Sequence, residues 1–104
     1  MDAIFHALSD PTRRRILELL REQELKAGVI AQRFAMTRPA ISQHLKVLSQ
    51  AGLVAIRTQG TSRYYRLRRE ALAALRIYLA AFWDERLAAL KAAVETSATD
   101  DTSR

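Results

Sequence analysis

The stretch TRPAISQHLKVLSQAGLV, from Thr37 to Val54, carries hydrogen-bonding side chains at helical spacing. Placed at 100° per residue, it divides into an apolar arc and a polar arc. Hydroxyl, amide, guanidinium and ammonium groups contact phosphates and base edges, so the polar arc could read nucleic acid. Thr37 can cap this helix, and Gly52 ends it. The polar arc comprises Arg38, Pro39, Ser42, Gln43, Lys46, Ser49 and Gln50, and the apolar arc comprises Ala40, Ile41, His44, Leu45, Val47, Leu48 and Ala51.

The positive charge of the chain is concentrated in the same region. The formal net charge is +6, yet the segment from Leu25 to Arg69 holds nine Lys or Arg residues and no Asp or Glu. Such a one-sided distribution is what binding a polyanion requires. A solvated basic surface without a partner is the alternative interpretation. The basic residues are Lys26, Arg33, Arg38, Lys46, Arg57, Arg63, Arg66, Arg68 and Arg69.

A β-hairpin is predicted directly after this helix, in the stretch LVAIRTQGTSRYYRL. Two β-branched and aromatic runs flank a turn at Gln59-Gly60, which is a hairpin signal. Tyr65 and Leu67 share one face and are expected to pack inward. The hairpin is basic, so it is suited to lie along a sugar-phosphate backbone as a wing. A hairpin that only caps the core is the alternative. Its basic residues are Arg57, Arg63 and Arg66.

Three shorter helices are expected upstream, and they must hold the polar helix in place. Residues 2–8 form the first, SDPTRRRILELLRE forms the second, and AGVIAQRF forms the third. Asp10 can cap the second helix, with Pro11 at its first position. The three consecutive arginines of the second helix are expected at the surface. Those arginines are Arg13, Arg14 and Arg15, and the expected core residues are Ile16, Leu19, Leu20, Val29, Ile30 and Phe34.

The segment from Arg69 to Glu95 predicts one long amphipathic helix with apolar residues at three- and four-residue steps. This apolar stripe is larger than a small domain can cover, and large exposed apolar patches are rare on monomers. We therefore expect a two-fold dimer in which this helix packs on its mate and on the first helix. Ordinary core packing within one chain is the alternative. The expected interface comprises Ile4, Phe5, Leu8, Leu72, Leu75, Leu79, Phe82, Trp83, Leu87, Leu90 and Val94.

The order of helix, turn, polar-faced helix and basic hairpin resembles the winged helix-turn-helix repressors of the ArsR/SmtB family. The resemblance rests on ALSDPTRRRILELL, TRPAISQHLKVLSQAGLV and RTQGTSRYYRL. It implies a mainly α fold with a small β-hairpin, dimeric through its first and last helices. It also implies a dimeric repressor whose reading helix enters the major groove. Two such helices related by a two-fold axis and held about 34–36 Å apart predict a palindromic operator. The DNA contacts that it implies are Thr37, Arg38, Ser42 and Gln43, with Lys46 and the wing residues Arg57 and Arg63 beside them.

The last helix is similar to that of the SdpR-like subgroup through FWDERLAALKAAVE, and this subgroup is often described as repressing its own operon. The chain departs from the metal-sensing members of the family, because it has no cysteine and its last helix has no histidine. Asp84 and Glu85 are adjacent, so they point about 100° apart on a helix. His44 lies in the apolar arc and is expected to be packed and hydrogen-bonded. We expect no metal cofactor, and either an unknown small-molecule effector or none.

Two other classes of function make different demands on the residues. An enzyme would need a nucleophile-base pair or a carboxylate constellation in a pocket. The acidic residues lie instead in the second and last helices, where helical pairing and solvation explain them. An adaptor that uses a winged helix to bind protein, without sequence-specific DNA binding, is the alternative function.

Length and hydropathy bound the organisation of the chain. A chain of 104 residues indicates one domain, expected over residues 1–95 with a disordered tail over residues 96–104. A domain this small has a thin core, which makes oligomerisation an expectation. No apolar stretch approaches the ~20 residues that span a bilayer, so a soluble cytoplasmic protein without a membrane partner is expected.

Overall fold

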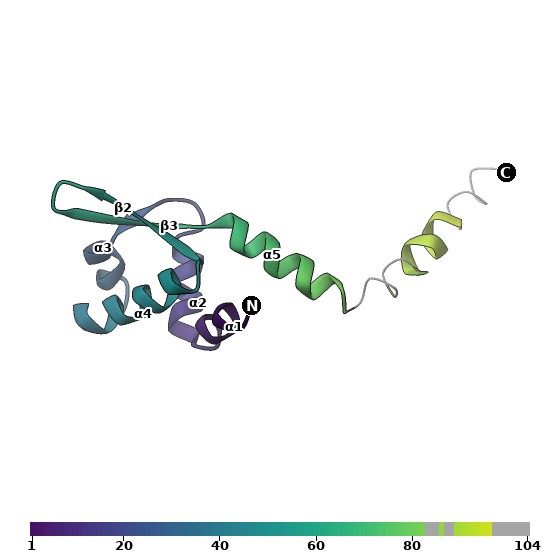
Figure 1. Cartoon of the computed structure of the whole chain (residues 1–104), viewed down its shortest axis with the longest axis horizontal. Helices are drawn as coiled ribbons and strands as arrows, with labels where there is room; N and C mark the ends of the chain where they lie inside the picture. Colours follow the sequence, from purple (N-terminus) through teal and green to yellow (C-terminus); the bar gives the residue numbers. More distant parts are fainter. Residues whose placement is uncertain (83–85, 87–88, 97–104) are drawn as a thin grey trace. The chain divides into compact units, whose positions relative to one another are not determined.

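The computed structural model describes residues 1–82, 86 and 89–96 of the chain (Figure 1). Two compact units are present, Met1–Ala73 and Ala74–Arg104. Residues 89–96 are helical. No helix among the described residues has the length and apolar character needed to cross a membrane. The elements are α1 (Asp2–Leu8), α2 (Pro11–Leu19), β1 (Leu25–Lys26), α3 (Ala27–Gln32), α4 (Arg38–Gln50), β2 (Val54–Gln59), β3 (Ser62–Leu67) and α5 (Arg69–Ala80).

Helix α2 begins at a side-chain cap, as predicted. The Asp10 carboxylate accepts hydrogen bonds from the backbone N–H of Thr12 at 2.7 Å and of Arg13 at 3.2 Å. Pro11 follows at the first position, where its missing N–H leaves no intrahelical bond unmade. Burial disfavours the ionised carboxyl, but the two N–H groups and the electrostatic interactions with His44 and Arg13 outweigh it and lower the pKa of Asp10.

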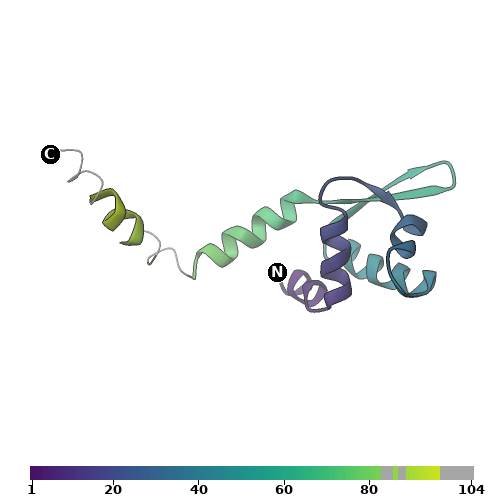
Figure 2. The same ribbon diagram turned by 180° about the vertical axis from the view of Figure 1, so that it is seen from behind.

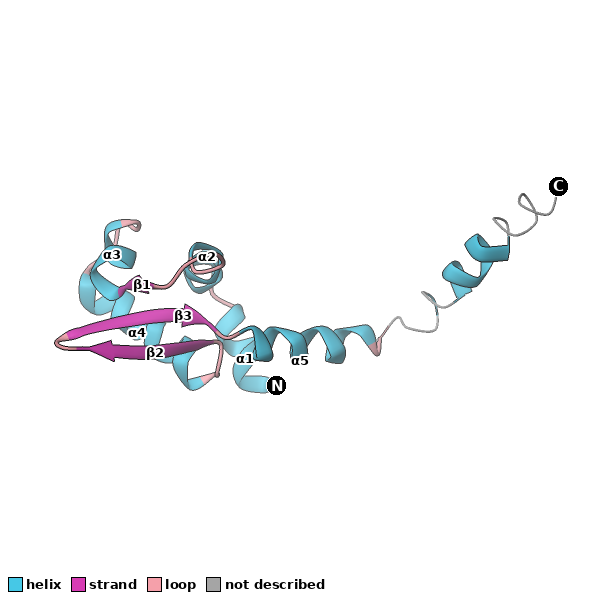
Figure 3. Cartoon of the chain, turned by 90° about the horizontal axis from the view of Figure 1, so that it is seen from above, coloured by secondary structure: helices cyan, strands magenta, loops and turns pink. Residues whose placement is uncertain are grey.

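The three strands form an antiparallel sheet with β3 between β1 and β2 (Figure 3). Strands β2 and β3 pair from Val54 opposite Leu67 to Gln59 opposite Ser62. The turn was expected at Gln59-Gly60, but it lies one residue later because Gln59 still belongs to the ladder. Gly60 has a φ of 61°, in the left-handed region that favours glycine.

Strand β1 was not expected from the sequence. It contains only Leu25 and Lys26, which pair with Tyr65 and Tyr64 of β3. Two residues are too short for an alternating pattern to be recognised. The strand nevertheless connects the segment that follows α2 to strand β3 of the hairpin.

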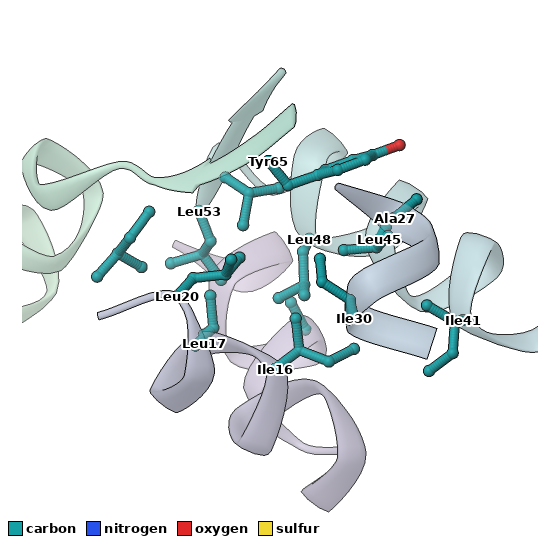
Figure 4. Packing of buried hydrophobic residues seen from close by; sticks show 13 residues of the cluster. Ile16, Leu17, Leu20, Ala27, Ile30, Ile41, Leu45, Leu48, Leu53 and Tyr65 are labelled. Atoms are coloured by element: carbon teal, nitrogen blue, oxygen red, sulfur yellow. The ribbon is translucent and has the colours of Figure 1, made fainter. Parts of the chain in front are cut away.

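The core of the Met1–Ala73 unit lies where α2, α3 and α4 converge beneath the hairpin (Figure 4). The apolar arc predicted for α4 is confirmed, since Ile41, Leu45 and Leu48 are at most 1% exposed. Tyr65 and Leu67 of β3 also pack inward, as predicted. The buried apolar residues are Ala7, Ile16, Leu17, Leu20, Ala27, Ile30, Ile41, Leu45, Leu48, Leu53, Val54, Tyr65 and Leu67, with Ile4, Leu8, Leu19, Leu25, Ala31, Phe34, Val47, Ala51, Ala71 and Leu72 packed against them.

Arg13 corrects the expectation that all three arginines of α2 lie at the surface. It is only 9% exposed, whereas the two arginines after it are exposed. Its Nε donates to the carbonyl of Ala7 at 2.7 Å and its Nη2 to the carbonyl of His6 at 3.0 Å. The last carbonyls of a helix lack intrahelical partners, so the planar guanidinium satisfies the end of α1 while remaining charged.

The sequence predicts one helix from Arg69 to Glu95, but helix α5 ends at Ala80. This part of the prediction is wrong. The backbone N–H of Phe82 donates to the carbonyl of Leu79 at 3.1 Å, three residues back, which closes a turn at residues 81–82. Aromatic side chains lose rotamer freedom in a helix, which weakens continuation at this point. The apolar spacing passes through the turn unchanged, so periodicity could not reveal it. Trp83, Leu87 and tail residues 97–104 lie outside the described residues.

Candidate nucleic-acid interface

Helix α4 presents its polar arc outward from a well-defined start. Thr37 has extended backbone, and its Oγ1 accepts a hydrogen bond from the backbone N–H of Ala40 at 3.3 Å. This bond confirms the predicted cap and fixes the helix to begin at Arg38. The buried arc on one side forces the remaining side chains into solvent. The exposed polar residues of α4 are Arg38, Ser42, Gln43, Lys46 and Gln50.

Two grooves flank this exposed arc. Helices α3 and α4 lie side by side beneath the hairpin in both ribbon views (Figures 1 and 2). The first groove, of about 450 Å³, lies between α3, the start of α4 and the tip of the hairpin, and Arg38 and Ser42 line it. The second, of about 380 Å³, lies between α4 and the hairpin, and Lys46 lines it. Arg63 borders both grooves.

Four of the seven predicted DNA contacts therefore line these grooves: Arg38, Ser42, Lys46 and Arg63. Thr37 and Gln43 are exposed but border neither groove, Thr37 at the cap of α4 and Gln43 within it.

The Arg38 guanidinium lies beside the first turn of α3. A Cβ atom added to Gly28 would be 3.5 Å from Nη1 of Arg38, which is ordinary van der Waals contact. The guanidinium therefore lies close to the α3 backbone, within the first groove, and a methyl group at Gly28 would fit beside it. A guanidinium at the wall of a groove has the planar pair of donors that can contact a guanine edge in bidentate fashion.

The two predicted wing arginines point to opposite faces of the hairpin. Arg63 pairs with Thr58 and shares a face with buried Tyr65, which puts it on the side of α4. Arg57 pairs with Tyr64 and shares the other face. The hairpin therefore brings Arg63 to the grooves and does not bring Arg57 there.

Several groove residues were missed at the level of sequence. Gln32 of α3 and Thr61 and Ser62 at the wing tip line the first groove, and Ile56, which is 43% exposed, lines the second. Gln32 follows Gly28 by four residues, so both lie on one side of α3. That spacing was the available signal for Gln32. The turn residues carried no such signal, because their position depends on the register of the hairpin.

The residues predicted for a dimer interface fall into two groups. Ile4, Leu8 and Leu72 are half-buried against the core of their own unit, and Phe5 is 39% exposed. Helix α5 is described throughout and has no buried residue. Leu75 and Leu79 are half-buried. Among the described residues of the Ala74–Arg104 unit, the exposed large apolar side chains are Ile77, Tyr78, Phe82, Leu90 and Val94.

The positions of the described histidine and acidic residues determine whether a metal ion could be held among them. His44 is half-buried, and its Nδ1 lies 3.3 Å from Nη1 of Arg13, which confirms the predicted packed and hydrogen-bonded role. Within residues 1–82, 86 and 89–96, no three His, Cys, Asp or Glu residues are grouped as metal ligands would be.

Sequence comparison identifies the relatives of the chain. The profile described as bacterial regulatory protein, arsR family, matches residues 10–55. The HTH-type transcriptional regulator Rv2034 of Mycobacterium tuberculosis is 42% identical over 99 residues, which cover 95% of this chain and 92% of that protein. The transcriptional repressor SdpR of Bacillus subtilis is 45% identical over 67 residues, which cover 64% of this chain and 74% of that protein.

Solved structures agree with these relatives. A crystal structure of a possible transcriptional regulator for arsenical resistance matches with a TM-score of 0.71 and 42% identity, covering 85% of this chain and 95% of that one. The ArsR family transcriptional regulator RHA00566 matches with a TM-score of 0.75 and 30% identity, covering 80% and 86%. These relatives are regulators and not enzymes. With its winged helix-turn-helix fold, the chain belongs to the ArsR family of DNA-binding transcriptional regulators.

Proposed function

We propose that this regulator is a homodimeric repressor that reads a palindromic operator with α4 and steadies itself on the DNA with the wing. The observation that carries the proposal is the exposed polar arc of α4 between two grooves, with Arg38, Ser42, Lys46 and Arg63 along their walls. The width of a B-DNA major groove admits one α-helix, and this arc supplies the donors and acceptors that base edges and phosphates require.

The contacting side chains divide the work by their chemistry. Arg38 and Gln43 have the planar, bidentate groups that distinguish bases, so they are assigned to reading. Ser42 and Thr37 offer hydroxyls near the start of α4, where free backbone N–H groups also favour a phosphate. Lys46 and Arg63 supply charge to the DNA backbone.

The exposed apolar side chains of the Ala74–Arg104 unit support the dimer. Ile77 and Phe82 are 69% and 68% exposed, and Leu90 and Val94 are 62% and 60% exposed. Apolar surface of this kind is stabilised when a second copy covers it. Two reading helices related by a two-fold axis can enter successive major grooves when they are held about 34–36 Å apart, so the operator should be palindromic. The functional domain would extend over residues 1–95, with residues 96–104 as a tail.

The control of this repressor would not depend on a metal ion. Zinc and arsenite are held by thiolate or imidazole ligands, and the sequence contains no cysteine and only two histidines, His6 and His44. His44 is already engaged by Arg13. A small-molecule effector, or control through the abundance of a repressor that acts on its own operon, is the expected alternative.

Selection of bound fragments from random or genomic DNA tests the proposal as a whole. The full chain should enrich a palindrome with half-sites about one helical turn apart. Enrichment of a single asymmetric half-site would contradict the dimer, and no enrichment above random DNA would favour the protein-binding adaptor. A gel shift at several salt concentrations separates sequence-specific binding from simple charge attraction.

A further inference from the structure

Arg57 on the outer face of the wing donates hydrogen bonds within the protein from all three nitrogens of its guanidinium. Its Nε donates to Oε1 of Glu24 at 2.9 Å, and its Nη2 donates to the same oxygen. Its Nη1 donates to Oε1 of Gln59 at 2.8 Å. Each nitrogen of the guanidinium therefore has an acceptor, and the group is held in one orientation.

The aromatic ring of Tyr64 forms a platform beneath this ion pair. Cζ of Arg57 lies 4.4 Å from the centroid of the ring, and Nζ of Lys26 lies 5.5 Å from it. Both cations come from strands that pair with Tyr64, since Lys26 and Arg57 are its partners in β1 and β2. The row from Lys26 through Tyr64 to Arg57 thus crosses all three strands of the sheet.

The ion pair joins parts of the fold that no strand pairing joins. Glu24 lies just before β1, whereas Arg57 lies in β2, on the other side of β3. Strand β1 is only two residues long, so backbone pairing anchors the hairpin at β3 alone. The Glu24 carboxylate reaches across β3 and ties the far strand to the segment that follows α2.

The pKa shifts of the two partners favour the charged form of each. The hydrogen bond from Arg57 lowers the pKa of Glu24, against the effect of burial, and the charges of Arg57 and Arg66 lower it further. The same bond raises the pKa of Arg57. Glu24 is the last acidic residue before the basic segment, and its negative charge is balanced by Arg57.

We propose that Glu24 and Arg57 form a clamp that positions the wing, so that Arg57 supports DNA binding through Arg63 and does not contact phosphate itself. The inference rests on the proposed role of the wing in DNA binding, and it assigns that role to one face of the hairpin. Arg57 is a positioning residue, and Glu24 is its partner. Loss of either residue loosens the wing. Arg63, which lies on the opposite face of the hairpin, then moves out of position.

Salt dependence of DNA binding separates a clamp from a phosphate contact. The full chain is titrated onto a duplex of random sequence and onto the selected operator, with Arg63→Ala as the matched control. A lost phosphate contact lowers the slope of log K against log salt by about one, and Arg63→Ala should do so. Arg57→Ala should weaken operator binding about two- to fivefold, the range expected for an exposed pair. Because the clamp acts through Arg63, Arg57→Ala added to Arg63→Ala should lower the slope no further than Arg63→Ala alone. A further reduction of about one in the double variant would show that Arg57 contacts phosphate itself and would overturn the clamp.

Reversal of the pair gives a second test. Arg57→Glu alone should weaken operator binding, and adding Glu24→Arg should recover at least half of the loss, since the two side chains can pair in the opposite order. A double variant no better than Arg57→Glu would contradict the clamp. Glu24→Gln should also weaken binding. Stronger binding with a steeper salt slope would show instead that Glu24 prevents Arg57 from contacting a DNA phosphate, and would contradict the clamp.

Hydrogen exchange tests the clamp independently of DNA. Amide protection in Val54–Gln59 should fall in Arg57→Ala and in Glu24→Gln, and it should stay unchanged in Arg63→Ala. Equal protection in all three variants would overturn the clamp. If the wild-type protein shows no specific DNA binding but the exchange result holds, the proposed function fails and the clamp stands.

Discussion

The guanidinium of Arg13 in α2 lies between the end of α1 and the middle of α4, with its Nη1 3.3 Å from Nδ1 of His44. The same guanidinium also donates hydrogen bonds to the carbonyls of Ala7 and His6, in the last turn of α1. One buried side chain therefore joins α1, which carries part of the proposed dimer interface, to α4, which carries the proposed reading surface. The relative position of these two helices depends on it.

Replacement of Arg13 by methionine should lower the free energy of unfolding by about 2–4 kcal/mol, because two carbonyls lose a charged donor in a buried site. The measurement is urea denaturation of the full chain. Arg14→Met is the control, since Arg14 is exposed and donates one bond to the Leu8 carbonyl at 2.7 Å. Its effect should stay below about 1 kcal/mol. Equal effects of the two substitutions would mean that burial of Arg13 contributes little.

Acid should destabilise the fold through Glu24 and Asp10. The folded protein lowers the pKa of both carboxyls below their ordinary values of 4.5 and 3.8. A lowered pKa contributes stability that is present above the ordinary value and is lost as the pH falls through the folded value. Urea midpoints measured from pH 7 to pH 3 should therefore fall below about pH 4.5, and fall less steeply in Glu24→Gln. Parallel curves for the variant and the wild type would contradict this linkage.

Charge placed on the apolar face of α5 should separate the dimer. The double substitution Leu79→Glu and Phe82→Glu should give folded monomers with much weaker operator binding, although neither residue is assigned to DNA. Analytical ultracentrifugation at micromolar concentration measures the assembly. Arg76→Glu is the control, because it also adds negative charge to α5 but at an exposed position that is already polar. A wild-type monomer, or a double variant that still dimerises, would refute the proposed assembly.

Metal ions should not release the operator. Zinc and arsenite added in stoichiometric amounts should leave the fluorescence anisotropy of a labelled operator complex unchanged, since the chain has no thiolate ligand. A metal bound with sub-micromolar affinity that dissociates the complex would contradict this expectation. A metal-sensing relative with an intact ligand set is the positive control.

Periodicity predicted the parts of the fold that repeat over several turns. The buried arc of Ile41, Leu45 and Leu48 followed from spacing alone, because burial on one face of a helix dictates the spacing. Burial of Arg13 could not be predicted, since its partners are backbone carbonyls of another helix. The turn at Phe82 was also missed, because a hydrogen-bond shift from four to three residues leaves the apolar pattern intact.

The sequence predicted most residues of the candidate site, but it did not predict which of them lie on which face of the hairpin. Arg38, Ser42, Lys46 and Arg63 were named from the sequence, and the structure gathers them along two grooves. Arg57 carries the same charge and lies in the same hairpin, yet it points to the other face. Which arginine faces α4 depends on the register of the strands, which pairs residues distant in sequence.

The specificity of DNA binding after substitution on α4 tests the central assignment most directly. Affinities for the selected operator and for a random duplex are measured at one salt concentration for Arg38→Ala and Gln43→Ala. Each variant should lose about 1–3 kcal/mol on the operator and much less on random DNA, so the ratio of the two affinities falls at least fivefold. Arg63→Ala should weaken both alike. A ratio unchanged in Arg38→Ala and Gln43→Ala would contradict the assignment of α4 as the reading helix.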